Sequence, residues 1–91
     1  MWEIRQTKRF GRIYKKLKPN VSSEVDIAIE KVAKNPDLGE KKKGDLAKLW
    51  VYKFNYLGQL YLLGYTRDDG LRLVYLEAIG SHENFYRDLK K

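Results

Sequence analysis

The single histidine, His82, is the side chain best suited to acid–base chemistry near neutral pH. It follows Gly80 and Ser81 at the end of an apolar run that is typical of a buried strand. A histidine at a strand end can transfer a proton to or from a substrate. It can equally well stay at the surface and donate a hydrogen bond to a carbonyl group. The histidine alone therefore leaves both roles open.

Fixed positive charge and aromatic rings supply the second group of candidates. Lys53 interrupts an otherwise apolar segment, where its ammonium group can stabilise a phosphate or simply face solvent. Phe85 and Tyr86 follow His82 closely, and an aromatic ring there can stack on a base or pack the chain end onto the core. For Phe85 we favour packing. Basic residues with interleaved aromatic residues suit single-stranded RNA, although the spacing is not that of an RNP motif.

The composition excludes several classes of protein. The chain has 91 residues, 43% of them hydrophobic, so it is expected to form one folded domain over residues 1–91. It contains no cysteine, which excludes a disulfide scaffold, a thiol nucleophile and a cysteine-bearing zinc site. One histidine cannot form a multi-histidine metal centre. We therefore expect chemistry without a metal or another cofactor.

The apolar residues also bear on location. No uninterrupted apolar stretch approaches the roughly 20 residues that span a bilayer. Residues 1–12 carry charges throughout and lack the apolar segment of a signal peptide. The sequence therefore predicts a cytoplasmic protein with no membrane partner.

Positive charge is concentrated in two zones of a chain whose net charge is +7. Residues 1–19 hold seven lysines and arginines against one glutamate, and these include Arg9 and Arg12. The second zone is the run Lys41, Lys42 and Lys43, with Lys53 beyond it. Two separate basic zones indicate a surface that meets an acidic partner, whereas basic residues on one helix face are often only solvated.

Apolar periodicity predicts a first strand at residues 2–6 and two helices after it. Thr7 can cap the first helix, whose apolar positions are Phe10, Ile13, Tyr14 and Leu17. The second helix is expected to begin at Asn20 or Ser22 and to stop at Pro36. Its apolar stripe consists of Val21, Val25, Ala28, Ile29 and Val32.

The second half of the chain reads as a polar loop and three strands. The loop covers residues 37–45, and the strands cover residues 49–55, 60–67 and 71–79. Asp-Asp-Gly at 68–70 predicts the hairpin turn between the last two strands, and residues 81–90 read as a polar tail with room for one helical turn or two. The order is thus β-α-α-β-β-β, in which a helical hairpin covers one sheet face and leaves the other, with Lys53 on it, at least partly open.

Three segments of this half resemble the RelE/ParE superfamily of toxins from type II toxin–antitoxin systems. They are Asp45–Phe54 (DLAKLWVYKF), Tyr61–Tyr65 (YLLGY) and Gly80–Lys90 (GSHENFYRDLK). The Gly-x-His-Glu-Asn-Phe-Tyr ending is the most specific of them, whereas the first half of the chain matches only in architecture. The resemblance implies an α+β fold, with the helical hairpin packed on one face of a four-stranded, largely antiparallel, twisted sheet.

The resemblance implies one of two activities. The RelE branch consists of endoribonucleases that cut mRNA in the ribosomal A site, and the ParE branch of gyrase poisons that are not nucleases. In both branches an antitoxin encoded nearby, acidic in its wrapping segment, silences the toxin. We expect the first activity, with antitoxin, ribosome and mRNA as partners and a toxin–antitoxin hetero-oligomer. A gyrase inhibitor, or a weakly active or inactive member that only binds its antitoxin, remains the alternative.

The resemblance also assigns roles to residues. His82 takes the acid–base role in metal-free cleavage by the 2′-OH, and Tyr86 orients or stacks the scissile nucleotide. Lys53 stabilises charge, helped by Arg67 or Arg87. Lys41, Lys42 and Lys43 resemble basic residues that touch ribosomal RNA, which the helix face with Arg9 and Arg12 is also expected to meet. Two cations of the family pattern are missing, because the corresponding positions hold Asn55 and Leu62.

Overall fold

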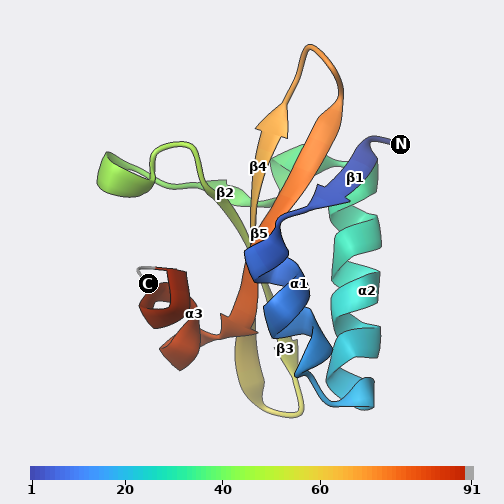
Figure 1. Cartoon of the computed structure of the whole chain (residues 1–91), viewed down its shortest axis with the longest axis vertical. Helices are drawn as coiled ribbons and strands as arrows, with labels where there is room; N and C mark the ends of the chain where they lie inside the picture. The colour runs from blue at the N-terminus through green and yellow to red at the C-terminus, as the bar shows by residue number, and fades with distance from the viewer. Residues whose placement is uncertain (90–91) are drawn as a thin grey trace.

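The chain folds into a mixed α+β domain, seen here in a computed structural model that describes residues 1–89. Figure 1 shows its elements in order: β1 (Glu3–Gln6), α1 (Lys8–Lys15), α2 (Pro19–Lys34), the 3-10 turn η1 (Pro36–Leu38), β2 (Glu40–Lys41), the 3-10 turn η2 (Gly44–Leu46), β3 (Trp50–Tyr56), β4 (Gln59–Asp68), β5 (Leu73–Ser81) and α3 (His82–Leu89). None of the helices in residues 1–89 is long and apolar enough to cross a membrane.

One sheet organises the domain, with the strand order β1-β5-β4-β3-β2. β1 runs parallel to β5, and the other neighbours are antiparallel. Figure 1 shows α1 and α2 on one side of the sheet and α3 on the other. The expected helical hairpin on one face of a largely antiparallel sheet is therefore confirmed.

The sheet has five strands rather than the expected four. The additional strand, β2, is two residues long and pairs Glu40 with Val51 and Lys41 with Trp50. It lies inside the segment that was expected to be a loop. Two charged residues carry no alternation of apolar and polar positions, so their pairing depends on the neighbouring strand and not on local pattern. β2 fastens the lysine run to the edge of the sheet.

The two helices of the hairpin begin in different ways. The Thr7 hydroxyl accepts a hydrogen bond from the Phe10 amide (3.1 Å), as expected for the first helix. The second helix begins at Pro19, before the expected Asn20 or Ser22, because a proline in the first turn has the right φ angle and needs no hydrogen-bond acceptor. The Ser22 hydroxyl bonds back to the Pro19 carbonyl instead (3.0 Å).

The turn between β4 and β5 also differs from expectation. β5 begins at Leu73, two residues later than predicted, and the residue with positive φ is Arg72 (54°) and not Gly70. The Asp68 carboxylate accepts a hydrogen bond from the Leu71 amide (3.0 Å), which closes the longer turn. An aspartate that bonds to a nearby backbone amide stabilises turns of this kind.

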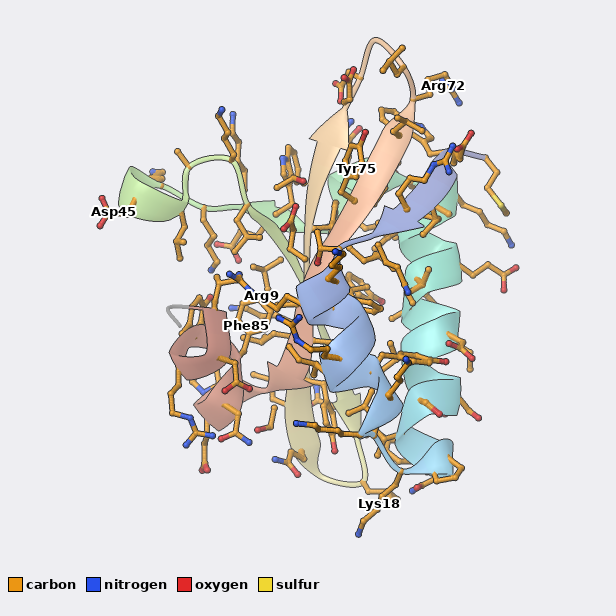
Figure 2. All side chains as sticks on the ribbon, viewed as in Figure 1. Arg9, Lys18, Asp45, Arg72, Tyr75 and Phe85 are labelled. Carbon is orange, nitrogen blue, oxygen red and sulfur yellow. The ribbon has the colours of Figure 1, made fainter. Side chains whose placement is uncertain are left out.

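The polar tail, with its expected room for one or two helical turns, forms the helix α3, which covers part of the sheet face that was expected to be at least partly open. Phe85 is 1% exposed and packs with a second, smaller core. The other buried members of that core are Leu49, Val51, Leu62 and Ala78. Gly64 makes room for the ring, since a Cβ atom there would lie 2.6 Å from Phe85 Cζ. Figure 2 shows Phe85 between α3 and the sheet.

Candidate functional site

The sheet brings Lys53 and the start of α3 to one face. Along β3, Val51 belongs to the core under α3, so Lys53, two residues on, has its side chain on the same face. Lys53 pairs with Leu62, which pairs with Gly80, two residues before His82. At about 4.8 Å per strand, the Lys53 backbone is about 10 Å from Gly80. An extended ligand can therefore contact both regions at once.

His82 and Tyr86 occupy one side of α3. They are four residues apart, which places them one turn apart along the helix. The Tyr86 ring meets the Phe85 ring edge-on, with centroids 4.9 Å apart and planes at 86°. Because Phe85 is buried, it holds the ring of Tyr86 in place. His82 is exposed, and within residues 1–89 no hydrogen bond or ion pair engages its imidazole.

One of the three loop lysines reaches this side of α3. The Lys42 ammonium lies 5.9 Å from the centroid of the Tyr86 ring, within the range of a cation–π contact. The Lys42 amide donates to the Leu49 carbonyl (2.9 Å), which continues the pairing that β2 begins. Lys41 and Lys43 are exposed. We call Lys42, Lys53, His82 and Tyr86 the α3-face cluster.

Lys53 has an acidic neighbour that was not foreseen. Glu40 Oε2 lies 3.9 Å from Lys53 Nζ, in a pair whose two side chains are about half exposed or more. Asn55 shares the face of Lys53, two residues on, and is exposed. A pair this exposed is screened by water and contributes well under about 1 kcal/mol, so it leaves Lys53 available to a phosphate. Glu40 lies near Lys53 because β2 pairs with β3, so no local pattern in the sequence predicts this contact.

Arg67 does not join the cluster. It shares its face of β4 with Tyr65, which is buried in the core under α1 and α2. Its guanidinium stacks between the rings of Trp2 (4.9 Å) and Trp50 (4.8 Å) and bonds to Asp37 and Asp69 at 2.7 and 2.8 Å. The side chain is only 11% exposed. The expectation that Arg67 stabilises charge beside Lys53 is therefore not supported by its position.

Arg87 and the two arginines of α1 also lie away from the cluster. Arg87 is exposed and bonds to Asn84 Oδ1 (2.9 Å). At 3.6 residues per turn, five positions beyond His82 correspond to about 140° around the helix, so Arg87 points away from the His82 side. Arg9 and Arg12 line a hollow on the opposite flank of α3.

Removal of the Arg67 side chain is expected to lower the free energy of unfolding by about 2 kcal/mol, because two ring contacts and two ion pairs are lost together. Arg67→Lys should lower the free energy of unfolding by about half as much, since an ammonium group keeps the charge but cannot stack as the planar guanidinium does. Urea denaturation checks both values. Arg87→Ala is the exposed control and should change stability by less than about 0.5 kcal/mol. Equal effects at the two positions would contradict the stacked arrangement.

Tyr65 ties the segment before β2 to the core. Its hydroxyl donates to the Pro36 carbonyl (2.6 Å) and accepts from the Gly39 amide (3.0 Å). Burial raises the pKa of the Tyr65 phenol above its ordinary value, more than the Gly39 hydrogen bond and the nearby Arg67 charge lower it. Since β2 begins directly after Gly39, Tyr65 contributes to the position of the lysine run.

The raised pKa predicts a loss of stability in alkali. The unfolded chain ionises this phenol near pH 10, while the folded chain holds it neutral, so the folded state binds more protons above that pH. The free energy of unfolding should be unaffected by this group below about pH 10 and should fall as the pH rises toward the raised pKa. Tyr65→Phe should lower the free energy of unfolding by about 1–2 kcal/mol at neutral pH. As the pH rises above about 10, the free energy of unfolding of this variant should fall less steeply than that of the parent protein. Parallel alkaline declines in the two proteins would contradict the prediction.

The fold is shared with solved toxin structures. A toxin–antitoxin complex RelBE2 from Mycobacterium tuberculosis contains a chain with a TM-score of 0.78 and 22% identity, and the match covers 89% of this chain and 98% of that one. For a chain of the intact RelBE toxin–antitoxin complex of E. coli, the TM-score is 0.73 and the identity 19%, and the match covers 88% of this chain and 95% of that one. For the isolated E. coli RelE toxin, the TM-score is 0.71 and the identity 18%, and the match covers 89% of this chain and 84% of that one.

Sequence comparison identifies the family directly. No curated protein gives a significant match to this chain. The profile of the ParE-like toxins of type II bacterial toxin–antitoxin systems, however, matches residues 4–90. That match spans both helices of the hairpin, the whole α3-face cluster and the Gly-x-His-Glu-Asn-Phe-Tyr ending. The chain therefore belongs to the ParE-like toxins of type II toxin–antitoxin systems, within the RelE/ParE superfamily.

Proposed function

We propose that this toxin is a ribosome-dependent endoribonuclease that cleaves mRNA without a metal ion. The observation that supports this most is the α3-face cluster, in which a histidine and a tyrosine of α3, a lysine of β3 and a lysine of the segment after β2 lie on one side of the sheet. Such a combination offers proton transfer, ring stacking and positive charge to a single-stranded substrate.

Each residue of the α3-face cluster has its own part in the proposed reaction. Cleavage by the 2′-OH forms a bond from the 2′ oxygen to phosphorus and breaks the bond to the 5′ oxygen, which leaves a cyclic 2′,3′-phosphate and a 5′-hydroxyl. His82 carries one of the two proton transfers, either from the 2′-OH or to the departing 5′ oxygen. Lys53 neutralises the charge that develops on the phosphate oxygens. Tyr86 stacks on a base, and Lys42 adds a second positive charge beside that ring.

Lys42 takes the supporting role that was expected of Arg67 and Arg87. Neither arginine lies beside Lys53, whereas Lys42 contacts Tyr86. Lys41 and Lys43 flank Lys42 and are exposed, which suits contact with ribosomal RNA. The cluster thus combines a reacting centre with a basic margin on the same side of the sheet.

We infer that a protein antitoxin encoded in the same operon holds the toxin silent in a hetero-oligomer. Two of the similar solved structures are toxin–antitoxin complexes. The net charge of +7 suits a partner with an acidic segment. A cytoplasmic location follows from the proposed ribosomal target.

Mapping of mRNA ends in a cell-free translation extract tests the nuclease. New 5′-hydroxyl ends are expected when toxin and ribosomes are both present, and the same mRNA without ribosomes should stay intact. Intact mRNA in both reactions, while the toxin still stops growth, would contradict the proposal.

The second candidate is a toxin that inhibits gyrase and does not cut RNA. It is favoured by Asn55 and Leu62, which stand where the nuclease pattern has cations; Leu62 is 0% exposed beneath α3. Gyrase-dependent DNA breaks with intact mRNA would support it. A member that only binds its antitoxin would give neither effect, and its induction would leave growth unchanged.

A further inference from the structure

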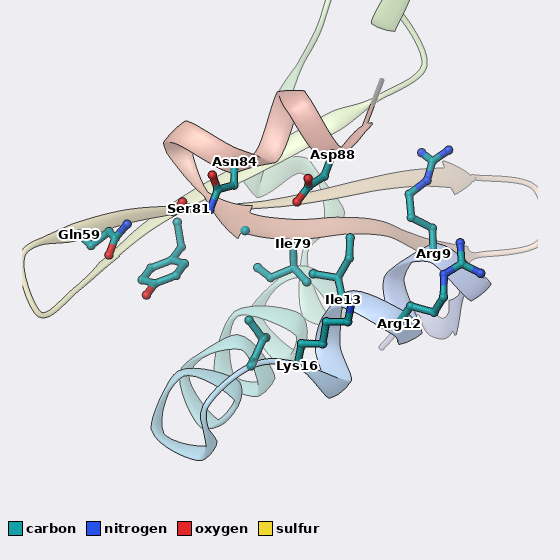
Figure 3. Close-up of a pocket in the computed structure, with 12 residues that line it drawn as sticks. Arg9, Arg12, Ile13, Lys16, Gln59, Ile79, Ser81, Asn84 and Asp88 are labelled. Atoms are coloured by element: carbon teal, nitrogen blue, oxygen red, sulfur yellow. The ribbon is translucent and has the colours of Figure 1, made fainter. Parts of the chain in front are cut away.

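A groove lies between α1 and α3, on the flank of α3 away from the α3-face cluster. Its volume is about 570 Å³, which lies in the range of small-molecule sites. Figure 3 shows Arg9 and Arg12 on the α1 side, and Asn84 and Asp88 on the α3 side. None of these four residues belongs to the α3-face cluster, so the groove is a separate surface.

Ser81 lines the groove with an unused hydroxyl group. The residue is 9% exposed, and within residues 1–89 its hydroxyl makes no hydrogen bond. Every side-chain nitrogen or oxygen of those residues that is sealed from solvent does have a partner, so the Ser81 hydroxyl opens into the groove. A largely buried hydroxyl without a partner in the protein favours a polar ligand at this place.

The same serine directly precedes the first turn of α3, which has eight residues. A serine there commonly accepts a hydrogen bond from an amide of the first turn, as the Thr7 hydroxyl does at α1. Within residues 1–89, no side chain caps the first turn of α3 in this way. The partial positive charge of the helix start is therefore available to a negatively charged group.

Two further donors flank the start of α3. Asn84 Oδ1 accepts a hydrogen bond from Arg87 Nη2 (2.9 Å), which leaves the Asn84 NH₂ group as a donor. Lys16 lines the groove from the end of α1 and is exposed. Hydroxyl, amide and ammonium donors around a helix start are the groups that bind a phosphate.

The rest of the groove suits a nucleoside. Its floor is apolar and includes Ile13, Ile79 and the ring of Tyr61. Asp88 lies four residues beyond Asn84, which is about 6 Å along the helix and a distance that one ribose spans. A carboxylate at that point accepts hydrogen bonds from ribose hydroxyls, and it repels a second phosphate. The groove therefore complements one nucleotide better than a run of phosphates.

We propose that this groove binds a nucleoside monophosphate, with the phosphate at the start of α3. The Ser81 hydroxyl, the Asn84 amide and the Lys16 ammonium hold the phosphate. Asp88 accepts from the ribose hydroxyls, and the base lies on the apolar floor beside Tyr61. The site goes beyond the proposed cleavage of mRNA, since it uses none of the side chains of the α3-face cluster.

An NMR titration of the full chain with adenosine 5′-monophosphate tests the site, with adenosine as the matched control. The monophosphate should shift the backbone amides of residues 81–84, and adenosine should bind at least about tenfold more weakly. Ser81→Ala should weaken binding of the monophosphate by about tenfold. Because the hydroxyl has no partner within residues 1–89, this variant should fold as the parent does, which its amide spectrum shows.

Charge changes in the groove give a second test. Lys16→Ala should weaken binding of the monophosphate by about fivefold, whereas Lys15→Ala, at an exposed position outside the groove, should weaken it by less than about twofold. Asp88→Asn should weaken binding of the monophosphate by about threefold, because a carboxylate accepts from ribose more strongly than an amide does. The same change should strengthen binding of inorganic phosphate, because a negative charge is removed. A merely structural role of Asp88 would move both affinities in one direction.

Several results would overturn the groove assignment. They are no shift of residues 81–84 at millimolar monophosphate, equal binding of adenosine, equal weakening by Lys15→Ala, and shifts at residues 52–54 around Lys53 in place of 81–84. A single-stranded RNA that shifts residues 81–84 at far lower concentration than the monophosphate would assign the groove to a polynucleotide instead. The mRNA assay is independent of this titration, so nucleotide binding without mRNA cleavage would keep the groove and remove the nuclease.

Discussion

Replacement of Phe85 with alanine is expected to lower the free energy of unfolding by about 3–5 kcal/mol. The ring is 1% exposed and fills the space above Gly64, between α3 and the sheet. α3 has eight residues, and Phe85 is the one that is buried, so its removal takes away most of what docks the helix. A helix this short is unstable in water without tertiary contacts.

Urea denaturation followed by tryptophan fluorescence measures the loss. Phe85→Leu is the matched variant, because it refills part of the space and should cost less than half as much. Increased hydrogen exchange along residues 82–89 of Phe85→Ala would show that α3 has detached. A loss below about 1 kcal/mol, with α3 still protected, would contradict the docking of α3 through Phe85.

Replacement of His82 with alanine is expected to reduce ribosome-dependent mRNA cleavage by about 10²–10⁴-fold, the range for removal of a general acid or base. Lys53→Ala should reduce it by about 10²–10³-fold, as expected for one group that stabilises charge. Both side chains are exposed, so neither change should alter stability by more than about 0.5 kcal/mol. Single-turnover cleavage on ribosomes, with end mapping, measures these effects.

Two controls make the kinetic test specific. Lys53→Arg keeps the positive charge and should recover part of the activity that Lys53→Ala loses. Lys31→Ala removes a charge from the exposed side of α2 and should leave cleavage within about twofold, since loss of one surface charge far from the site is largely screened. If His82→Ala and Lys53→Ala cleave as well as the parent protein, the α3-face cluster is not the reacting centre.

The periodicity of the sequence was enough to predict the sheet faces of β3. Trp50, Tyr52 and Phe54 alternate with Val51 and Lys53, and the structure places the first set under the helices and the second toward α3. Alternation works here because a strand turns every second side chain to the same face. The same reasoning missed β2, since two residues carry too little pattern to identify an element, and it allowed one or two helical turns at α3 without predicting that they dock on the sheet.

The choice of cations in the candidate site required the tertiary structure. Arg67 and Lys42 were both predicted as site residues, and nothing local distinguished them. The register of β4 turns Arg67 toward Trp2 and Trp50, whereas the pairing of β2 and the docking of α3 bring Lys42 to Tyr86. These contacts join residues far apart in the chain, and their geometry depends on the packing of the whole sheet.

By itself, the sequence determined the order of β1, the helical hairpin and the three long strands, the basic character of the chain, and the position of its one histidine at the end of the last strand. These properties are local, because they depend on residue type and spacing alone. The tertiary structure alone decided that α3 covers part of the second sheet face, that Arg67 is held in a stack away from Lys53, and that a basic groove borders β5. Each of these depends on which surfaces meet when the chain folds, which local spacing does not encode.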